Sequence, residues 1–259
     1  VLGPAHNDAT VRLAQARQVM DAGWCAAWAQ QIVQAKLHRQ ARVLARWRQD
    51  RPDARLALTR AERGVATVRE ALAVLHADSG DTFARLATLR GLEGTAARAH
   101  FAGLAAVLPP ALGFTGRNRR LPRDPANACL SLGYTLLHAE AVTAAQAAGL
   151  DPLLGFYHRP AFGRESLASD LIEPLRAEVD AWVAALFRDR TLREDHFTRP
   201  ESPGGACLLG KAGRQTFYAE WAAHAVRPLR RWLRWRCAAL ARVLRAQGES
   251  ALAASAFDE

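Results

Sequence analysis

The chain has 259 residues, of which 50% are hydrophobic and 23% charged, so it has the composition of a folded protein with a sizeable core. It carries 35 Lys and Arg against 25 Asp and Glu, a formal net charge of +10, and all but Lys36 and Lys211 of these cations are arginines. No apolar run approaches the roughly 20 residues of a membrane span. The charge favours a phosphate-rich partner, because arginine binds phosphates bidentately, although an Ala- and Arg-rich composition is equally typical of a GC-rich genome.

The cysteines indicate the redox compartment of the protein, and the first residue bears on whether the chain is a piece of a longer one. The four cysteines are far apart and form no C-x-x-C pair, so we expect neither a disulfide framework nor a zinc ribbon. A reducing cytosol fits this pattern, and no signal-peptide pattern opens the chain. The first residue is Val rather than Met, which favours a piece of a longer protein over a processed start.

Hydrophobic spacing predicts an all-α chain without a β-rich domain. The predicted helices cover about residues 10–47, 59–77, 81–107, 124–148, 166–188 and 214–247. The first of them carries an apolar stripe that consists of Leu13, Met20, Trp24, Trp28, Ile32 and Ala35. The segment 189–213 is expected to be irregular, with at most a short strand at residues 206–209.

Local start and stop signals set these boundaries. The last predicted helix should bend or break at Pro228, and the fifth must accommodate Pro174, because proline lacks the N–H that a helix interior requires. Pro109-Pro110 should end the third helix. The expected N-terminal signals are a cap at Asp8 or Thr10, a capping box at Thr59-x-x-Glu62, a cap at Asp81, and an N-cap and N1 pair at Asp124-Pro125.

Glu93 is placed unusually, between Gly91 and Gly94 inside a helical pattern. Each glycine costs about 1 kcal/mol relative to alanine in a helix. Close approach of a ligand or of another backbone would explain this cost, although an ordinary structural position stays open.

Other titratable residues allow several interpretations. Asp170 and Glu173 share one helix face among apolar neighbours, where carboxylates need a partner. A metal ion is one candidate, and an ion pair between Glu173 and Arg176 is the simpler one. His158 lies in a loop between aromatic residues and arginines, and considered alone it is better explained as a surface histidine.

Two basic clusters stand out, the loop at residues 117–123 and the final-helix segment 227–236, in which Trp232 and Trp235 alternate with arginines. The second could bind phosphates, or equally be a solvated helix face with its tryptophans in the core. The P-loop, the dinucleotide fingerprint, the zincin motif and the nucleophile elbow are all absent, which disfavours those enzyme classes.

Four segments, taken together and in this order and spacing, resemble the catalytic domain of the CRISPR-associated integrase–endonuclease family, which acquires spacers in antiviral defence. They are Leu92-Glu-Gly-Thr-Ala-Ala-Arg, residues 117–134, residues 155–176 and Arg214-Gln-Thr-Phe-Tyr. The resemblance covers most of residues 10–245. It implies an all-α, multi-helix domain at residues 9–248, with a linker tail at 1–8 and a flexible tail at 249–259. The family's small N-terminal β-rich domain has no counterpart in this pattern, because the helical pattern begins at once.

The resemblance also assigns site residues. Glu93, His158 and Glu173 match the family's metal ligands, which implies Mg²⁺ or Mn²⁺, and Asp170 matches a further catalytic acidic position. His100 stands where the family usually has tyrosine. The positions expected to contact DNA are Arg117, Arg119, Arg120, Arg123, Arg164 and Arg176, and those expected to support the site are Asn127 and Tyr134.

The implied activity is that of a metal-dependent DNA endonuclease and integrase, a nuclease that joins prespacer 3′-hydroxyl ends to CRISPR repeat DNA by transesterification. The implied partners are prespacer and repeat DNA, a second copy in a homodimer, a small bridging adaptation protein and, as in some family members, a fused or associated reverse transcriptase. No membrane is expected among the partners. Two alternatives stay open: an integrase of a mobile element, and a catalytically silent DNA-binding scaffold. The presence of all three expected ligands argues against the silent scaffold.

Overall fold

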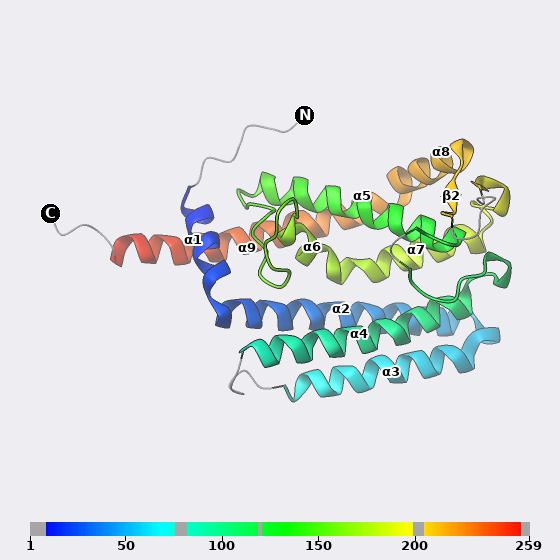
Figure 1. Cartoon of the computed structure of the whole chain (residues 1–259), viewed down its shortest axis with the longest axis horizontal. Coiled ribbons are helices and arrows are strands. Elements are labelled where there is room, and N and C mark those ends of the chain that lie inside the picture. The colour runs from blue at the N-terminus through cyan, green and yellow to red at the C-terminus, as the bar shows by residue number, and fades with distance from the viewer. Residues whose placement is uncertain (1–8, 76–81, 119–120, 199–204, 255–259) are drawn as a thin grey trace.

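The computed structural model describes residues 9–75, 82–118, 121–198 and 205–254, and within these ranges the protein is almost entirely helical (Figure 1). The helices are α1 (Ala9–Met20), α2 (Ala22–Asp50), α3 (Arg55–Ala73), α4 (Thr82–Val107), α5 (Pro125–Ala147), α6 (Ser166–Ile172), α7 (Arg176–Arg188), α8 (Lys211–Glu220) and α9 (Val226–Ala254). The strands β1 (Phe197–Thr198) and β2 (Leu208–Leu209) pair antiparallel. The all-α prediction and the short strand near residues 206–209 are therefore confirmed.

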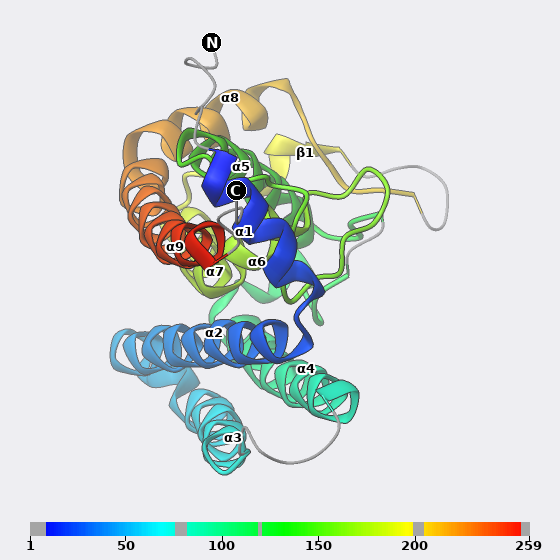
Figure 2. The ribbon, with the colours of Figure 1, turned by 90° about the vertical axis from the view of Figure 1, so that its left-hand side faces the viewer.

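The helices form two groups that meet at α2. Helices α3 and α4 pack on one side of α2, while α5, α6, α7 and α9 lie on the other (Figure 2). Leu37 and Leu44 of α2 are fully buried between the groups. Gly103 lets α4 approach α2 closely, because a Cβ there would lie 2.4 Å from a methyl carbon of Leu44. None of the described helices has the length and apolar character to cross a membrane.

The long first helix that we expected is divided in two. α1 ends at Met20, and Asp21 caps α2 by accepting a hydrogen bond from the backbone N–H of Trp24 at 2.9 Å. α1 packs against α9 instead of continuing along the line of α2. Leu13 and Met20 are 61% and 85% exposed and therefore lie outside the core. The apolar stripe is correct only from α2 onward, because an aspartate inside an apolar pattern offers the backbone a side-chain cap.

The capping box expected at Thr59 is also wrong. The second helix begins at Arg55, directly after a 3₁₀ turn at Pro52–Ala54, and Thr59 donates inside it to the carbonyl of Arg55 at 2.8 Å. Glu62 pairs instead with Arg48 of α2 at 2.8 Å. Thr10 lies within α1, whereas the other two expected caps, Asp8 and Asp81, lie outside the described residues.

The remaining helix boundaries follow the proline and cap signals more closely. Asp124 accepts a hydrogen bond from the backbone N–H of Asn127 at 2.8 Å and caps α5 as predicted. Pro174 lies in the 3₁₀ turn Glu173–Leu175 that separates α6 from α7. Pro228 falls in the first turn of α9, which tolerates proline, so the break lies earlier, at the π-helical turn Trp221–Ala225.

The end of α9 changes one domain boundary. The helix continues to Ala254, so residues 249–254, which we expected in a tail, extend the last helix. Residues 1–8, expected as a linker tail, and residues 255–259 lie outside the described residues.

Candidate active site

Two carboxylates from distant parts of the chain meet at one lysine. Lys36 of α2 donates from Nζ to a carboxylate oxygen of Glu93 on α4 and to Oε2 of Glu173, the latter at 2.7 Å. Glu173 belongs to the turn between α6 and α7, so three separate segments form the cluster. Lys36 is 9% exposed and Glu173 5%. The fold thus brings a positive charge to a buried point between two acids.

The charges around Glu173 keep it ionised. Arg176 donates from Nε to Oε1 of Glu173 at 2.9 Å, which confirms the ion pair that the i, i+3 spacing suggested. Burial raises the pKa of Glu173, but the charges of Lys36 and Arg176 outweigh it and bring this pKa from 4.5 to about 2. Burial lowers the pKa of Lys36, yet Glu173 and Glu93 together raise it above its ordinary value. Both partners are therefore charged at neutral pH.

Tyr157 completes the environment of Glu93. Its hydroxyl donates to Oε2 of Glu93. Burial, together with the negative charge of Glu93, raises the pKa of Tyr157 well above its ordinary value. Tyr157 is thus a permanent hydrogen-bond donor in this cluster.

Asp170 organises the loop that carries His158. It is fully buried, and its Oδ2 accepts hydrogen bonds from the backbone N–H groups of Phe156 at 2.8 Å and Tyr157 at 2.9 Å. Its Oδ1 accepts from the backbone N–H of His158 at 2.9 Å and lies 2.8 Å from His158 Nδ1. This contact leaves Nε2 as the ring atom for a ligand, in the carboxylate–histidine arrangement that orients metal ligands.

The donor chemistry of these residues fits the expected metal ion. Two carboxylates and one imidazole suit Mn²⁺, or Mg²⁺ with water completing its shell, and the carboxylates already face one common cation. In the described part of the chain, however, no three His, Cys, Asp or Glu side chains lie close enough together to hold a metal. The three-ligand site of Glu93, His158 and Glu173 stays a prediction, with Lys36 placed between two of its members.

A polar network behind the cluster connects the expected supporting residue Tyr134 to Arg176 and Asp180. The guanidinium of Arg176 lies 4.6 Å from the centre of the Tyr134 ring, and the Tyr134 hydroxyl donates to Asp180. His100 is fully buried, and its Nε2 lies 2.9 Å from the other oxygen of Asp180. The histidine thus provides a polar contact to α7 through Asp180.

The basic loop is held against α5. Arg117 donates to Oδ1 of Asn127 at 2.9 Å and to the hydroxyl of Ser131 at 3.0 Å, and its guanidinium lies 5.4 Å from the centre of the Tyr134 ring. Asn127 in turn donates to the carbonyl of Gly116 at 2.9 Å. Asn127 therefore fixes the loop, and Arg117 is engaged by protein groups.

The other predicted DNA contacts are placed differently. Arg123 and Arg164 are exposed, as a contact to phosphate requires, whereas the side chain of Arg176 is mostly buried beside Glu173. Arg119 and Arg120 lie outside the described residues. The role of these arginines in DNA binding stays a prediction.

Sequence reasoning missed Lys36 and Tyr157 as members of the site. A signal for Lys36 was available, because it is one of only two lysines in a chain whose other cations are all arginines. Tyr157 directly precedes His158, but tyrosine next to a histidine is not specific to any site chemistry. The contact of Lys36 to Glu93 depends on the packing of α2 against α4, and that of Tyr157 on the position of the loop before α6, neither of which the sequence pattern reveals.

Comparison with known proteins identifies the family. The family model described as CRISPR associated protein Cas1 matches residues 1–223. The chain belongs to the Cas1 family. A protein of Thermodesulfovibrio yellowstonii named CRISPR-associated endonuclease Cas1 1 is 36% identical over 216 residues, 83% of this chain and 65% of its own length. A Cas1 endonuclease of Rhodospirillum rubrum is 44% identical over 137 residues, 51% of this chain and 39% of its own length. The chain thus spans less than two thirds of these curated Cas1 relatives.

Solved structures support the same fold. A partial Cas6-RT-Cas1–Cas2 complex matches with a TM-score of 0.75 and 25% identity over 91% of this chain and 70% of the other. A casposase bound to its integration product matches with a TM-score of 0.76 and 23% identity over 95% of this chain and 68% of the other. A Cas1 protein of Thermotoga maritima matches with a TM-score of 0.70 and 21% identity, over 92% of this chain and 71% of the other. The predicted family and the Cas1-type helical domain are confirmed.

Proposed function

We propose that the protein is a metal-dependent DNA integrase and endonuclease of CRISPR adaptation, which joins prespacer 3′-hydroxyl ends to repeat DNA by transesterification. The observation that carries this proposal is the convergence of Glu93 and Glu173 on one buried cation position, where Tyr157, the neighbour of the Asp170-oriented His158, also contacts Glu93. Membership of the Cas1 family supports the same chemistry.

The reaction follows from the groups in the cluster. A bound Mg²⁺ or Mn²⁺ would polarise the scissile phosphate and stabilise the departing oxygen. Glu93, Glu173 and Nε2 of His158 would hold this ion, and Asp170 would keep the histidine ring in position. Lys36, released from the two carboxylates, would place its charge beside the phosphate, and Tyr157 would keep its hydrogen bond to Glu93.

The bonds balance without an external energy source. The 3′-hydroxyl of the prespacer end attacks the phosphorus of the target strand, and the bond from that phosphorus to its original 3′-oxygen breaks. One phosphodiester replaces another, and the proton of the attacking hydroxyl passes to the departing oxygen by way of solvent. With water as the attacking group, the same arrangement cleaves DNA.

The partners in this proposal are prespacer and repeat DNA, a second copy of the chain in a homodimer, a small bridging protein and an associated reverse transcriptase, all in the cytoplasm. The solved complex named Cas6-RT-Cas1–Cas2 shows a similar chain assembled with other proteins, named Cas2 and RT. The exposed arginines Arg123 and Arg164, with Arg119 and Arg120 of the basic loop, would contact the DNA backbone and make binding steeply dependent on salt.

A strand-transfer assay tests the proposal. The protein, assembled with its bridging partner, should join a labelled prespacer to repeat DNA with Mg²⁺ or Mn²⁺ and not with EDTA. Glu93→Ala and Glu173→Ala should each abolish joining, because each removes one ligand, while duplex binding should survive through arginine–phosphate contacts. Glu249→Ala, which removes an exposed glutamate of α9, is the matched control and should join normally.

Two results of this assay would reject the proposal or redirect it. Normal joining by Glu93→Ala would exclude the metal site described above. Joining of transposon ends in preference to a prespacer would favour the mobile-element integrase.

The glycines beside Glu93 give an independent test. A Cβ at Gly91 or Gly94 would meet no atom within 4 Å, so no other backbone of the described residues approaches there and the space is open to a ligand. Gly94→Ala should raise the free energy of unfolding by up to about 1 kcal/mol, because alanine favours the helix. If DNA approaches Glu93 on this side, Gly94→Ala should also slow strand transfer.

Gly64→Ala on α3 provides the contrast for this substitution. A Cβ at Gly64 would lie 2.9 Å from Cβ of Ala99, so alanine there should lower stability in thermal unfolding. Unchanged strand transfer in a stabilised Gly94→Ala variant would show that DNA does not pass this glycine.

A further inference from the structure

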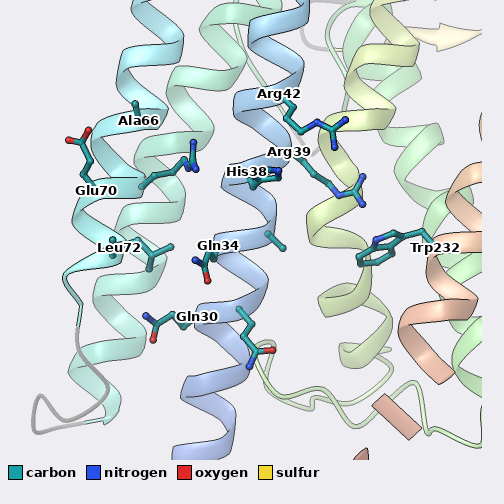
Figure 3. A pocket seen from close by; sticks show the side chains of 13 residues that line it. Gln30, Gln34, His38, Arg39, Arg42, Ala66, Glu70, Leu72 and Trp232 are labelled. Carbon is teal, nitrogen blue, oxygen red and sulfur yellow. The ribbon is translucent and has the colours of Figure 1, made fainter. Parts of the chain in front are cut away.

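Two hollows separate from the candidate active site lie along α2, one lined by α2, α3 and Trp232 of α9 (Figure 3) and the other mainly by α2, α7 and α9. Their volumes are about 940 and 870 Å³, and they meet at Arg39 and Trp232, which line both. We call the two hollows together the α2–α9 groove. Its lining on α2 extends from Gln30 to Asp50, about 30 Å at 1.5 Å per residue. None of the candidate site residues lines it.

Positive charge dominates this groove. Its arginines are Arg39, Arg42, Arg46, Arg69, Arg188 and Arg231, and its carboxylates are Asp50, Glu70 and Glu178. Glu178 is shared by Arg39 at 3.5 Å and Arg46 at 3.3 Å. Arg42, Arg69 and Arg231 are exposed, and no described carboxylate forms an ion pair with them. These three guanidinium groups are therefore available to an anionic partner.

Aromatic surface lies beside these charges. Figure 3 shows Arg39 extending from α2 toward Trp232, with Arg42 on the same side of α2, and the Arg39 guanidinium lies 5.2 Å from the centre of the Trp232 ring. Trp235, one turn further along α9, also lines the groove and is 61% exposed. The interpretation of this segment as a solvated face with its tryptophans in the core is therefore wrong for Trp235.

This combination points to one class of partner. A polyanion matches the excess of arginine, and an exposed indole offers a flat face on which an unpaired base can stack. The bases of a duplex are already stacked on one another, so a duplex would use the arginines but not Trp235. A single strand uses both. The length of the groove corresponds to at most roughly nine nucleotides at the 3.4 Å spacing of a stacked strand.

We infer that the α2–α9 groove binds single-stranded nucleic acid, with Arg42, Arg69 and Arg231 on the phosphates and Trp235 stacked on a base. This site goes beyond the proposed function, because it lies apart from Glu93 and Glu173 and needs no metal ion. It would hold an unpaired strand on the protein while the active site acts elsewhere.

The test measures binding of a fluorescein-labelled 12-nucleotide single strand by anisotropy, in EDTA so that the candidate metal site is not engaged. DNA and RNA strands of one sequence, and the matching DNA duplex, form three arms. The variant R42Q/R69Q/R231Q should weaken single-strand binding about 10- to 100-fold and lower the slope of log affinity against log salt by about 2, since each phosphate contact contributes roughly 0.7 for single strands. The control R17Q/R60Q/R242Q removes the same charge from exposed positions outside the groove and should leave both quantities nearly unchanged.

A second pair of variants isolates stacking. Trp235→Leu should weaken binding of the single strand roughly 5- to 150-fold, the range that one base–aromatic contact provides, whereas Trp235→Phe should bind almost as wild type. Duplex binding should not respond to either change. The difference between the DNA and RNA arms identifies which strand the groove prefers.

Three outcomes would overturn the inference: equal losses in the groove and control triple variants, equal behaviour of Trp235→Leu and Trp235→Phe, or an equal loss of duplex binding in Trp235→Leu. None of these would affect the proposed strand transfer, which Glu93→Ala tests separately. Conversely, groove binding that persists in a protein inactive in strand transfer would support this site alone.

Discussion

Replacing Lys36 by methionine is expected to lower the free energy of unfolding by about 3–5 kcal/mol in the absence of divalent metal. The Lys36 ammonium is buried between Glu93 and Glu173 and donates to both. Methionine keeps most of the volume of this side chain but none of its charge, so Glu93 would lose its counter-ion and Glu173 would keep only Arg176. Removing one partner of a buried ion pair typically costs this much. Denaturant unfolding followed by circular dichroism measures the change.

Addition of Mn²⁺ should then stabilise the Lys36→Met variant more than the wild type. In the wild type the ion has to displace the ammonium from the two carboxylates, whereas in the variant no ammonium lies between them. Saturation at about 100 times the dissociation constant contributes about 2.7 kcal/mol, enough to restore much of the loss. The gain in melting temperature with Mn²⁺ is measured without any reaction, so it reports on the site itself.

Lys211→Met is the matched control, because it makes the same chemical change at the other lysine, which is exposed at the start of α8. It should change stability by less than about 0.5 kcal/mol and respond to Mn²⁺ as the wild type does. An equal response to Mn²⁺ in Lys36→Met and wild type would mean that Lys36 and the metal do not share the carboxylates.

The same contacts should make stability depend on acid pH. Burial raises the pKa of Glu173, but Lys36 and Arg176 bring it from 4.5 to about 2 in the folded protein. Because the folded pKa is the lower one, the contribution is complete above about pH 4.5 and is lost as the pH falls through about 2. Without Lys36 the folded pKa rises, so the variant should lose this contribution at a higher pH than the wild type.

The sequence was a good guide to the fold where local signals and packing agree. Asp124 and Pro125 predicted the start of α5, and the cap geometry confirms them. The first helix was mispredicted because its apolar spacing continues through Asp21, where a side-chain cap starts a new helix. Pro228 was read as a break, yet it fits in the first turn of α9, because the helix is already interrupted at the π-helical turn before it.

The candidate site was predictable only through family motifs. Glu93, His158 and Glu173 lie in segments whose order and spacing resemble the Cas1 family, but no periodicity brings them together. Lys36 lies 57 positions before Glu93, and their contact arises from the packing of α2 against α4. The rarity of lysine in this chain marks Lys36 as unusual, but no local motif indicates which residues it contacts. The ion pair of Glu173 with Arg176 was predictable, because i, i+3 spacing brings two side chains to one side of a helical turn.

His158→Ala and Asp170→Asn should separate a metal ligand from the group that positions it. His158→Ala removes Nε2, the ring atom proposed to hold the ion, and should reduce strand transfer below detection. Its side chain makes one described hydrogen bond, to Asp170, so the free energy of unfolding should change by only about 1 kcal/mol.

Asp170→Asn should instead lower both stability and activity. Each carboxylate oxygen accepts two N–H groups, so an amide NH₂ in either orientation would face two donors with no lone pair to offer. The cost should be about 2–4 kcal/mol of unfolding free energy, measured in denaturant. The metal concentration for half-maximal strand transfer should rise about 10- to 100-fold, because the histidine loses its orienting partner.

Asp151→Asn in the same loop provides the control for the chemical change alone. Asp151 Oδ1 accepts one hydrogen bond, from the backbone N–H of Leu153 at 2.8 Å, in an exposed setting, so the amide should cost less than about 1 kcal/mol and leave metal activation unchanged. A normal metal requirement in a folded Asp170→Asn protein would mean that Asp170 supports the loop backbone but does not orient His158 toward an ion. Loss of strand transfer in Asp170→Asn at every metal concentration, with stability unchanged, would instead make Asp170 a direct ligand, since a positioning role can be overcome by excess metal and the absence of a ligand cannot.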